Sequence, residues 1–547
     1  MKALLLAGFA AAVPAAASAP AVNDDQLSTY VTARAADALG DPARAAILFA
    51  ELARQRPGDL DLKRRAVIGA IAAGDMRLAL QLGRSIPIEQ TPLDLRLLLV
   101  ADDLRSGRDK RAIEVLRTKQ GIIDSSFLAP FVEAWALAER RNPKAIDALG
   151  QVTPGSALAP HLNEQRALIY LKLRRPADAA PYAKIAVSSA GGRSDRMRLA
   201  LADGFLAAGD RARALEMLDG PGPALAFGRA RIAAGKPTGQ AIDSGAKAFG
   251  ELMIGMSLAL GRLSDRSLPI AFAQLARFAN PQNSAGAILL ALLLDDEGRT
   301  ADALDVLRTV DIGDAFAGQA EDAQIRMLID NGREREALQL AQRIVAERPS
   351  PDAYARLGVV HVELKNFAAA ADAYGRAIHA SANAEGSDEP WMLRLYRASA
   401  LEESGKWEEA KAELALALQQ QPENPLLLNF LGYGKLERGE DLDQAEAMVR
   451  KASALRPDDA SITDSLGWAE FKRGRLPQAI STLQRAAQAD PAQAEIQEHL
   501  GDALYTAGRR YEARFAWRAA LVNAEGDDKA RIQAKIDIGL TPATAAP

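Results

Sequence analysis

A repeated skeleton of small residues constrains the fold of this chain more than any other feature. The stretch "DSLGWAEFKRGRLPQAISTLQRAAQADP" (464–491) is followed by "EHLGDALYTAGRRYEARFAWRAAL" (498–521). Both contain Leu-Gly, a Gly seven residues later and an Ala five residues beyond it. Alignment on the first small residue of each copy gives Gly358, Ala398, Gly432, Gly467 and Gly501, with final intervals of 34, 35 and 34 residues. Such a period indicates one structural unit copied along the chain.

Each marker of the unit has a structural reason. Gly467 has no side chain, so a second helix can approach the first closely at that point. Gly474 suits a left-handed turn at the end of the first helix. Ala479 fits the place where two helices cross, and Pro491 cannot continue the second helix. The unit is therefore predicted to be a helix-turn-helix hairpin.

The period and the skeleton resemble the tetratricopeptide repeat (TPR) family. The resemblance is specific over 354–540, and weaker copies such as Gly40–Pro57 continue it toward the N-terminus. It implies an all-α fold, an α-solenoid (superhelix) of tandem TPR-like helix-turn-helix units. The stretch Leu431–Ala486 looks like the C-terminal units of exported bacterial TPR proteins, which include outer-membrane lipoproteins that act as adaptors of carboxyl-terminal processing proteases. This chain has no Cys, so it departs from those lipoproteins in lacking the lipobox Cys.

The repeats and the sequence between them predict a division of the chain. We expect a signal peptide at 1–21 with cleavage between 17 and 21, a divergent TPR-like array at 22–349 and a regular TPR array at 350–526. A capping helix is expected at 527–540, because solenoids need a polar outer cap, and a disordered tail at 541–547. Gly and Pro accumulate in the segment around 215–265, where we expect a distorted turn or bend.

The N-terminal sequence predicts export. Lys2 precedes a short apolar run, Leu4–Val13, and small residues follow, which is typical of a secretory signal peptide. Other apolar segments are too short to span a bilayer, so no transmembrane segment is expected, and without Cys there is no lipid anchor. We therefore expect an exported protein, periplasmic in a cell with two membranes. The formal net charge of −4 gives no support for a nucleic-acid partner.

The sequence shows no pattern that carries chemistry. The four histidines fall in different predicted helices without a partner at helical spacing, so no metal site is predicted. No nucleophile elbow or phosphate loop is present, and the acidic pairs are typical of solvated helix faces. We predict no catalytic residues, no cofactor and no enzymatic activity.

The resemblance implies a binding groove instead. In the TPR family, five positions of the first helix of each unit line the concave groove. Four of the side chains at those positions are aromatic, Tyr433, Trp468, Phe471 and Tyr505, and aromatic side chains on an open surface are the usual binding anchors. For Phe471 and Tyr505, packing against the adjacent repeat is the alternative role. The candidate groove residues are Asn429, Tyr433, Glu437, Asp464, Trp468, Phe471, Lys472, Asp502 and Tyr505.

Together these features favour a non-enzymatic scaffold that binds protein or peptide partners, for envelope assembly or proteolysis. A protease adaptor is one form of this hypothesis. A glycan-binding component of polysaccharide export is the alternative, because sugars also stack on aromatic side chains. The Lys and Asn clamp of chaperone-binding TPR domains is absent, since Asp464 and Trp468 occupy those positions.

Overall fold

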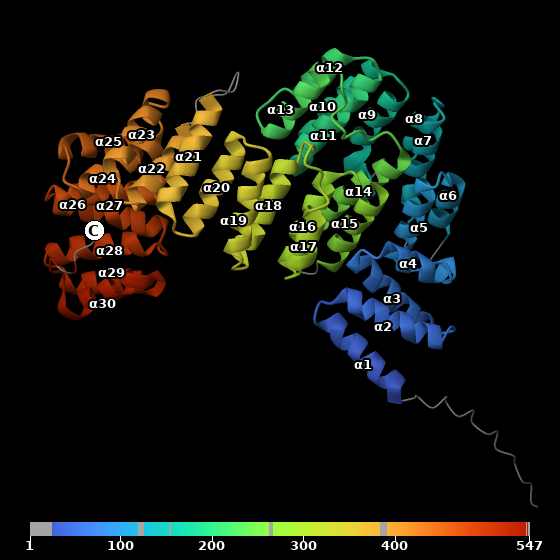
Figure 1. Ribbon diagram of the computed structural model, residues 1–547, viewed down its shortest axis with the longest axis horizontal. Coiled ribbons are helices and arrows are strands. Elements are labelled where there is room, and N and C mark those ends of the chain that lie inside the picture. Colours follow the sequence, from blue (N-terminus) through green and yellow to red (C-terminus); the bar gives the residue numbers. More distant parts are fainter. Residues whose placement is uncertain are drawn as a thin grey trace, which may run out of the picture. The chain divides into compact units, whose positions relative to one another are not determined.

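The computed structural model describes residues 24–118, 125–152, 155–261, 266–382, 391–542 and 544. The predicted signal peptide lies outside these residues, as do 383–390 and the last three positions of the predicted tail. All the regular elements in the described ranges are helices. The predicted all-α solenoid of tandem helical units is confirmed (Figure 1).

The chain divides into two compact units, Met1–Met327 and Leu328–Pro547, and helix α18 runs through the point of division. The predicted array boundary between 349 and 350 stays a prediction. The first unit contains α1 (Asp24–Ala38), α2 (Pro42–Gln55), α3 (Leu60–Ala73), α4 (Met76–Gly83), α5 (Leu93–Arg105), α6 (Asp109–Arg117), α7 (Ala129–Glu139), α8 (Ala145–Leu149), α9 (Leu162–Lys172), α10 (Pro176–Ser189), α11 (Ser194–Ala207), α12 (Arg211–Met217), α13 (Pro223–Ala233), α14 (Gly245–Leu260), α15 (Ser267–Ala279), α16 (Ser284–Asp296), α17 (Thr300–Leu307) and most of α18 (Ala317–Asp330).

The first unit also has four short 3-10 helices, η1 (Ile88–Gln90), η2 (Ser126–Leu128), η3 (Ala159–His161) and η4 (Gly191–Arg193). The second unit contains α19 (Glu334–Glu347), α20 (Pro351–Glu363), α21 (Phe367–Ala382), α22 (Trp391–Glu403), α23 (Trp407–Gln420), α24 (Pro425–Glu437), α25 (Leu442–Leu455), α26 (Ala460–Lys472), α27 (Leu476–Ala489), α28 (Ala494–Thr506), α29 (Arg510–Asn523) and α30 (Gly526–Ile538).

Regular hairpins build the second unit. Helices α20 to α29 pack in successive pairs, and each pair packs on the next (Figure 1). The first helices α24, α26 and α28 also contact one another in sequence order. Side chains that point from these three helices toward the same side therefore meet across repeats.

The glycine markers act as predicted. A Cβ atom on Gly467 would lie 2.7 Å from Cγ of Leu483, and one on Gly501 would lie 2.3 Å from Cδ1 of Trp517. Both are closer than packed carbon atoms approach, so the paired helices meet at a distance that only Gly allows. Gly474 has φ +74°, the left-handed conformation expected at the turn. Ala479 is fully buried at the crossing of α26 and α27.

The first unit is less regular. Its hairpins include α2 with α3, α9 with α10 and α14 with α15. Helix α13 packs on α11 and α12, and the segment 234–244 that follows it contains no helix. Gly220 and Gly222 before α13 have φ of +137° and +113°, which fits the distorted turn expected there. Helices α3 and α5 also pack against α15, so this unit adds distant contacts to those between neighbours.

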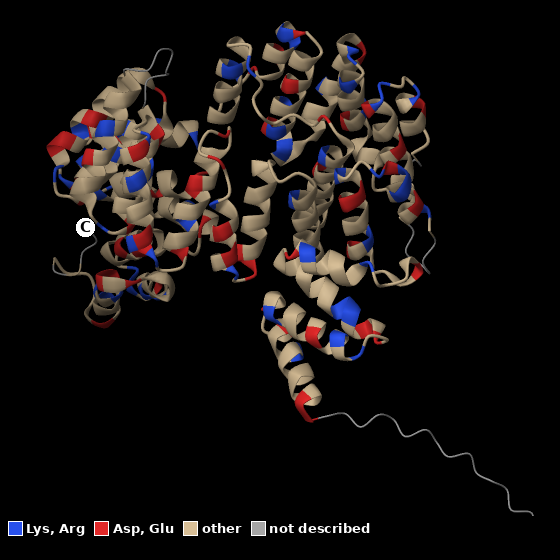
Figure 2. Cartoon of the chain, turned by 45° about the vertical axis from the view of Figure 1, so that its right-hand side comes forward, with Lys and Arg blue, Asp and Glu red and all other residues tan. Residues whose placement is uncertain are grey.

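Charges of both signs are interspersed along the helices of each unit (Figure 2). No helix in the part of the chain that the structure describes combines the length and the apolar character needed to cross a membrane.

Candidate functional site

The predicted groove residues lie on α24, α26 and α28, the first helices of three consecutive hairpins. The structure divides them by exposure. Lys472 is exposed. Five others are half-buried: Asn429, Tyr433, Glu437, Phe471 and Tyr505. The remaining three are buried, with exposed fractions of 4% for Asp464, 2% for Trp468 and 1% for Asp502. All three were expected to line an open groove, and their burial differs from that expectation.

Trp468 is buried because the following repeat covers it. Its indole stacks on the His499 ring, with centroids 4.0 Å apart and an interplanar angle of 13°. Phe471 on the same helix stacks with it at 4.8 Å. The indole Nε1 donates a hydrogen bond of 2.5 Å to Oε1 of Glu437 on the preceding first helix. Trp468 thus joins three repeats, and its ring is not presented to a ligand.

The carboxylate of Asp464 pairs with His499, the residue that also stacks on Trp468. Its Oδ2 lies 2.8 Å from Nδ1 of His499, which is 1% exposed. Burial by itself lowers the pKa of His499, but the carboxylates of Asp464, Glu495 and Asp502 more than compensate, and the pKa is raised above its ordinary value. The histidine was considered only as a metal ligand in the sequence analysis, and no group of metal-binding side chains occurs among the described residues.

Asp502 is covered by the capping helix α30. Lys535 of α30 is fully buried, and its Nζ donates to Oδ2 of Asp502 at 2.7 Å and to Oε1 of Glu498 at 2.6 Å. Arg531 binds both oxygens of Glu498, at 2.9 and 2.8 Å. Burial opposes ionisation of Glu498, but Arg531 and Lys535 hold its pKa below the ordinary value. Glu498 and Asp502 of α28, the first helix of the last hairpin, are therefore covered by α30 and paired with its charges.

Exposed Lys472 and three of the half-buried residues, Tyr433, Glu437 and Phe471, form what remains open of the predicted groove, and we call these four residues the open row. The Tyr433 hydroxyl donates to Oε1 of Glu495 at 2.9 Å. Burial, together with Glu495, raises the pKa of Tyr433, so the hydroxyl keeps its proton. Nζ of Lys472 lies 3.6 Å from Glu437 and 5.0 Å from the Trp468 ring centroid. These contacts fix the side chains before any partner arrives.

Two other predicted residues lie beside the open row. Oδ1 of Asn429 is buried without a hydrogen-bond partner in the structure. Tyr505 packs on Trp517 with centroids 5.3 Å apart, and its ring lies beneath Arg510. Trp407 and Trp517, which belong to second helices, are buried, whereas Phe515 on α29 is 52% exposed.

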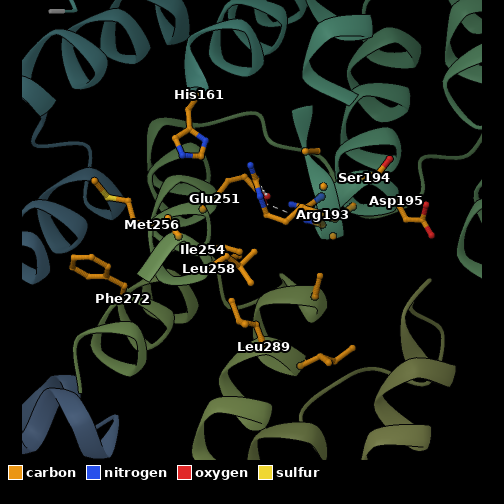
Figure 3. A pocket seen from close by; sticks show the side chains of 18 of the residues that line it. His161, Arg193, Ser194, Asp195, Glu251, Ile254, Met256, Leu258, Phe272 and Leu289 are labelled. Carbon is orange, nitrogen blue, oxygen red and sulfur yellow. Dashed lines mark hydrogen bonds and ion pairs between the residues drawn. The ribbon is translucent and has the colours of Figure 1, made fainter. Parts of the chain in front are cut away.

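The first unit contains a second feature that the sequence analysis missed, a cluster of buried charges beside a cavity. Arg193 pairs with Glu164 at 3.0 Å and with Glu251 at 2.7 Å, and Arg196 lies 3.4 Å from Glu251. Asn283 donates to Glu251 at 3.1 Å. These residues come from segments far apart in the sequence, so no local sequence motif predicts that they form a cluster. Figure 3 shows Arg193 and Glu251 on one side of the cavity.

Comparison with known proteins places the repeats in a family. A TPR repeat model matches residues 467–508, and a second tetratricopeptide repeat model matches 323–387. A search of curated proteins gave no match.

Solved structures similar to this chain include several helical repeat proteins. The APC/C hetero-tetramer Cut9-Hcn1 is 13% identical, over 94% of this chain and 90% of that chain, with a TM-score of 0.36. A tetratricopeptide repeat protein from Parabacteroides merdae is 14% identical, over 53% and 98%, with a TM-score of 0.32. YrrB, a TPR protein with an unusual peptide-binding site, is 17% identical, over 34% and 91%, with a TM-score of 0.26.

These TM-scores are too low to carry an argument about the site. The family models match the regions that contain Gly358, Gly467 and Gly501, three of the anchors of the alignment from which the period was read. With the tandem hairpins of the second unit, they show that the chain contains tetratricopeptide repeats.

Proposed function

We propose that this chain is a non-enzymatic scaffold that binds a protein or peptide partner at the open row of the second unit. Repeats of this family build interaction surfaces, which supports the general class. The observation that carries the proposal is the open row itself, which has an aromatic side chain on each of two consecutive first helices. Tyr433 is held by its hydrogen bond to Glu495, and Phe471 by stacking on Trp468. Glu437 is held by Trp468 and Lys472 of the next repeat. Side chains fixed in advance lose little entropy on binding, which favours affinity.

The open row also suggests what the partner offers. Tyr433 and Phe471 are partly exposed aromatic residues, and Glu437 and Lys472 of the same row form a paired acid and base. Aromatic anchors flanked by charges suit a peptide with an apolar side chain and polar neighbours. Stacking of a sugar on Trp468 would require an exposed face of the indole, and His499 and Phe471 stack on it. This favours a peptide partner over a glycan.

The partner can be sought by affinity capture. The full chain, immobilised, is incubated with the envelope fraction of its native cell, beside a Tyr433→Ala/Phe471→Ala variant. Phe515→Ala is the matched control, because it removes the same ring from a second helix outside the open row. We expect a protein that the wild type and Phe515→Ala retain and the double variant loses. Equal retention by all three chains would contradict binding at the open row.

We further propose that the protein is exported to the periplasm and acts there in envelope assembly or as a protease adaptor. The support is the sequence alone, Lys2 and the apolar run Leu4–Val13. Mature protein from the native cell is expected to begin between Ser18 and Val22. A cytosolic protein that keeps Met1 would contradict export, whereas a processed protein whose captured partner is a protease would support the adaptor role.

A further inference from the structure

The first unit contains a cavity that the proposed function does not use. Its volume is about 1150 Å³, and it lies between η3, η4, α11, α14, α15 and α16 (Figure 3). Apolar side chains form most of its lining, from Ile254, Leu258, Phe272, Ile288, Leu289 and Leu292. Pockets that bind small ligands typically have volumes of roughly 300–1,000 Å³. This cavity has room for more than one large apolar side chain.

One part of the lining, which we call the charged wall, carries Arg193, Arg196 and Glu251, and its charges are already neutralised. Both terminal nitrogens of Arg193 bind buried carboxylates, of Glu251 and Glu164. Burial opposes the charge of Arg193, but those two carboxylates raise its pKa above the ordinary value, so it stays ionised. Arg196 donates to the carbonyl of Gln240 at 2.6 Å and to Asn283 at 3.2 Å. An anionic ligand would have to displace a carboxylate that is itself buried, which is costly.

The balance of charge around the cavity is even. Two cations, Arg193 and Arg196, and two anions, Asp195 and Glu251, belong to the lining. A ligand with a net charge would therefore gain no complementary field and would lose its hydration. The lining suits an uncharged occupant. Ser194 and Gln319 also line the cavity, and their side chains can bond the peptide groups of such an occupant.

The mouth of the cavity exposes leucine. Leu258 of α14 is 43% exposed and Leu292 of α16 is 46% exposed, and the two helices are in contact. Apolar surface in water is unfavourable by about 25 cal/mol per Å². Two leucines at the edge of an apolar cavity form the kind of patch that marks a binding site.

We infer that this cavity binds an uncharged, apolar peptide segment, whose side chains enter between α14 and α16. The inference goes beyond the open row, because the two sites lie in different units and share no residue. A fatty acid would fill the apolar part equally well. Its carboxylate, however, would find no cation that is free of a carboxylate partner on the charged wall.

The test uses the full chain and a defined probe. The probe is a short peptide of Leu, Ala, Ser and Gln, capped at both ends and carrying a neutral environment-sensitive fluorophore. Saturable binding to the wild type is expected. Leu292→Asp should weaken the affinity by about tenfold or more, because the new charge must be desolvated at the mouth. Leu258→Asp is a second variant with the same expectation on the other helix.

Ile68→Asp is the matched control. Ile68 is 48% exposed on α3 and does not line the cavity, so this variant introduces the same charge at the same exposure. It should bind the probe as the wild type does. Melting curves of the variants establish that each is folded. The Tyr433→Ala/Phe471→Ala variant should also bind the probe normally, which separates this inference from the proposed function.

Three outcomes would overturn the inference. The wild type could fail to bind the peptide, or Leu292→Asp and Leu258→Asp, both folded, could bind it like Ile68→Asp. Third, dodecanoate could bind at the mouth in preference to the peptide, which would make the cavity a site for anionic amphiphiles. A peptide with one central Glu should bind more weakly than the uncharged probe, and equal binding would contradict the charge argument.

Discussion

Trp468 shows how a single residue can serve the fold where the sequence suggested a ligand site. Its position in the first helix is one that lines the groove in the TPR family, yet it is 2% exposed and hydrogen-bonded to Glu437. What covers it is His499, one repeat further along the chain. A sequence pattern within one repeat cannot report which side chain of the next repeat stacks on it.

We therefore expect Trp468→Ala to destabilise the protein. Truncation of a buried Trp typically costs about 3–5 kcal/mol, because transfer energy is lost and a cavity is left. Thermal unfolding followed by circular dichroism should show a clear fall in the Tm. Trp468→Phe, which keeps a ring but loses the hydrogen bond, should fall less. An unchanged Tm for Trp468→Ala would contradict the burial of the indole and would support the exposed position expected from the sequence.

His499 gives a prediction about pH. The pKa of His499 is raised in the folded protein, so the folded state binds the proton more tightly than the unfolded state. The stabilisation is fully present below the ordinary His pKa of about 6.5. It is lost as the pH rises through the higher folded value. Unfolding measured between pH 5.5 and 8.5, a range of about 3 pH units around that value, should thus show a contribution that decreases with rising pH.

The control for this effect is His499→Gln, which cannot take a charge. In that variant the decrease over the same pH range should be absent or much smaller. If the wild type and the variant keep the same pH dependence, the pair of Asp464 and His499 is not its source.

At the scale of elements, the hairpins of the second unit were predictable, whereas the contacts that attach the last helix were not. The turn glycine Gly474 and the contact glycine Gly467 act locally, so a single copy of the repeat carries the information. The capping helix was predicted from its polar sequence, but the burial of Lys535 in its last turn was not. The pattern of α30 gives no sign that a Lys meets two carboxylates of α28.

Loss of Lys535 should therefore weaken the attachment of α30. Lys535→Met leaves Asp502 without its cation and Glu498 with only Arg531, and breaking a buried pair typically costs about 3–5 kcal/mol. Chemical denaturation of the full chain should show the loss. The double variant Lys535→Met/Asp502→Asn should recover part of it, because Asn still accepts from Trp517 and carries no charge. No recovery would mean that the charge pairing is not the cause.

On the scale of the whole molecule, the repeat period predicted the class of fold, whereas the first unit's distant contacts and its cavity were not predictable. Glu164, Arg193, Glu251 and Asn283 meet through contacts between residues that are 29, 58 and 32 positions apart in the sequence. Such a cluster arises only from the folded arrangement. The open row was predictable only in part. The repeat register gave the positions of its residues, but neighbouring repeats determine how exposed each side chain is.

Because repeats couple mainly to their neighbours, damage in one array should stay local. Gly467→Ala brings a Cβ atom to 2.7 Å from Leu483, and overpacking of this kind typically costs about 1–3 kcal/mol. Hydrogen exchange with mass spectrometry should show faster exchange in α24 to α30 and unchanged exchange in α1 to α17. Gly192→Ala, where nothing lies within 4 Å, is the control. Faster exchange throughout the chain would show that the units unfold together.

The hydrogen bonds between repeats also bear on the order in which the protein is made. Glu437 is bound by Trp468, 31 residues later, Asp464 by His499, 35 residues later, and Glu498 by Arg531, 33 residues later. Each carboxylate thus leaves the ribosome about one repeat before the side chain that satisfies it. During synthesis the first helix of the newest hairpin carries an unpaired, hydrated acid, which disfavours association between unfinished chains until the next repeat arrives.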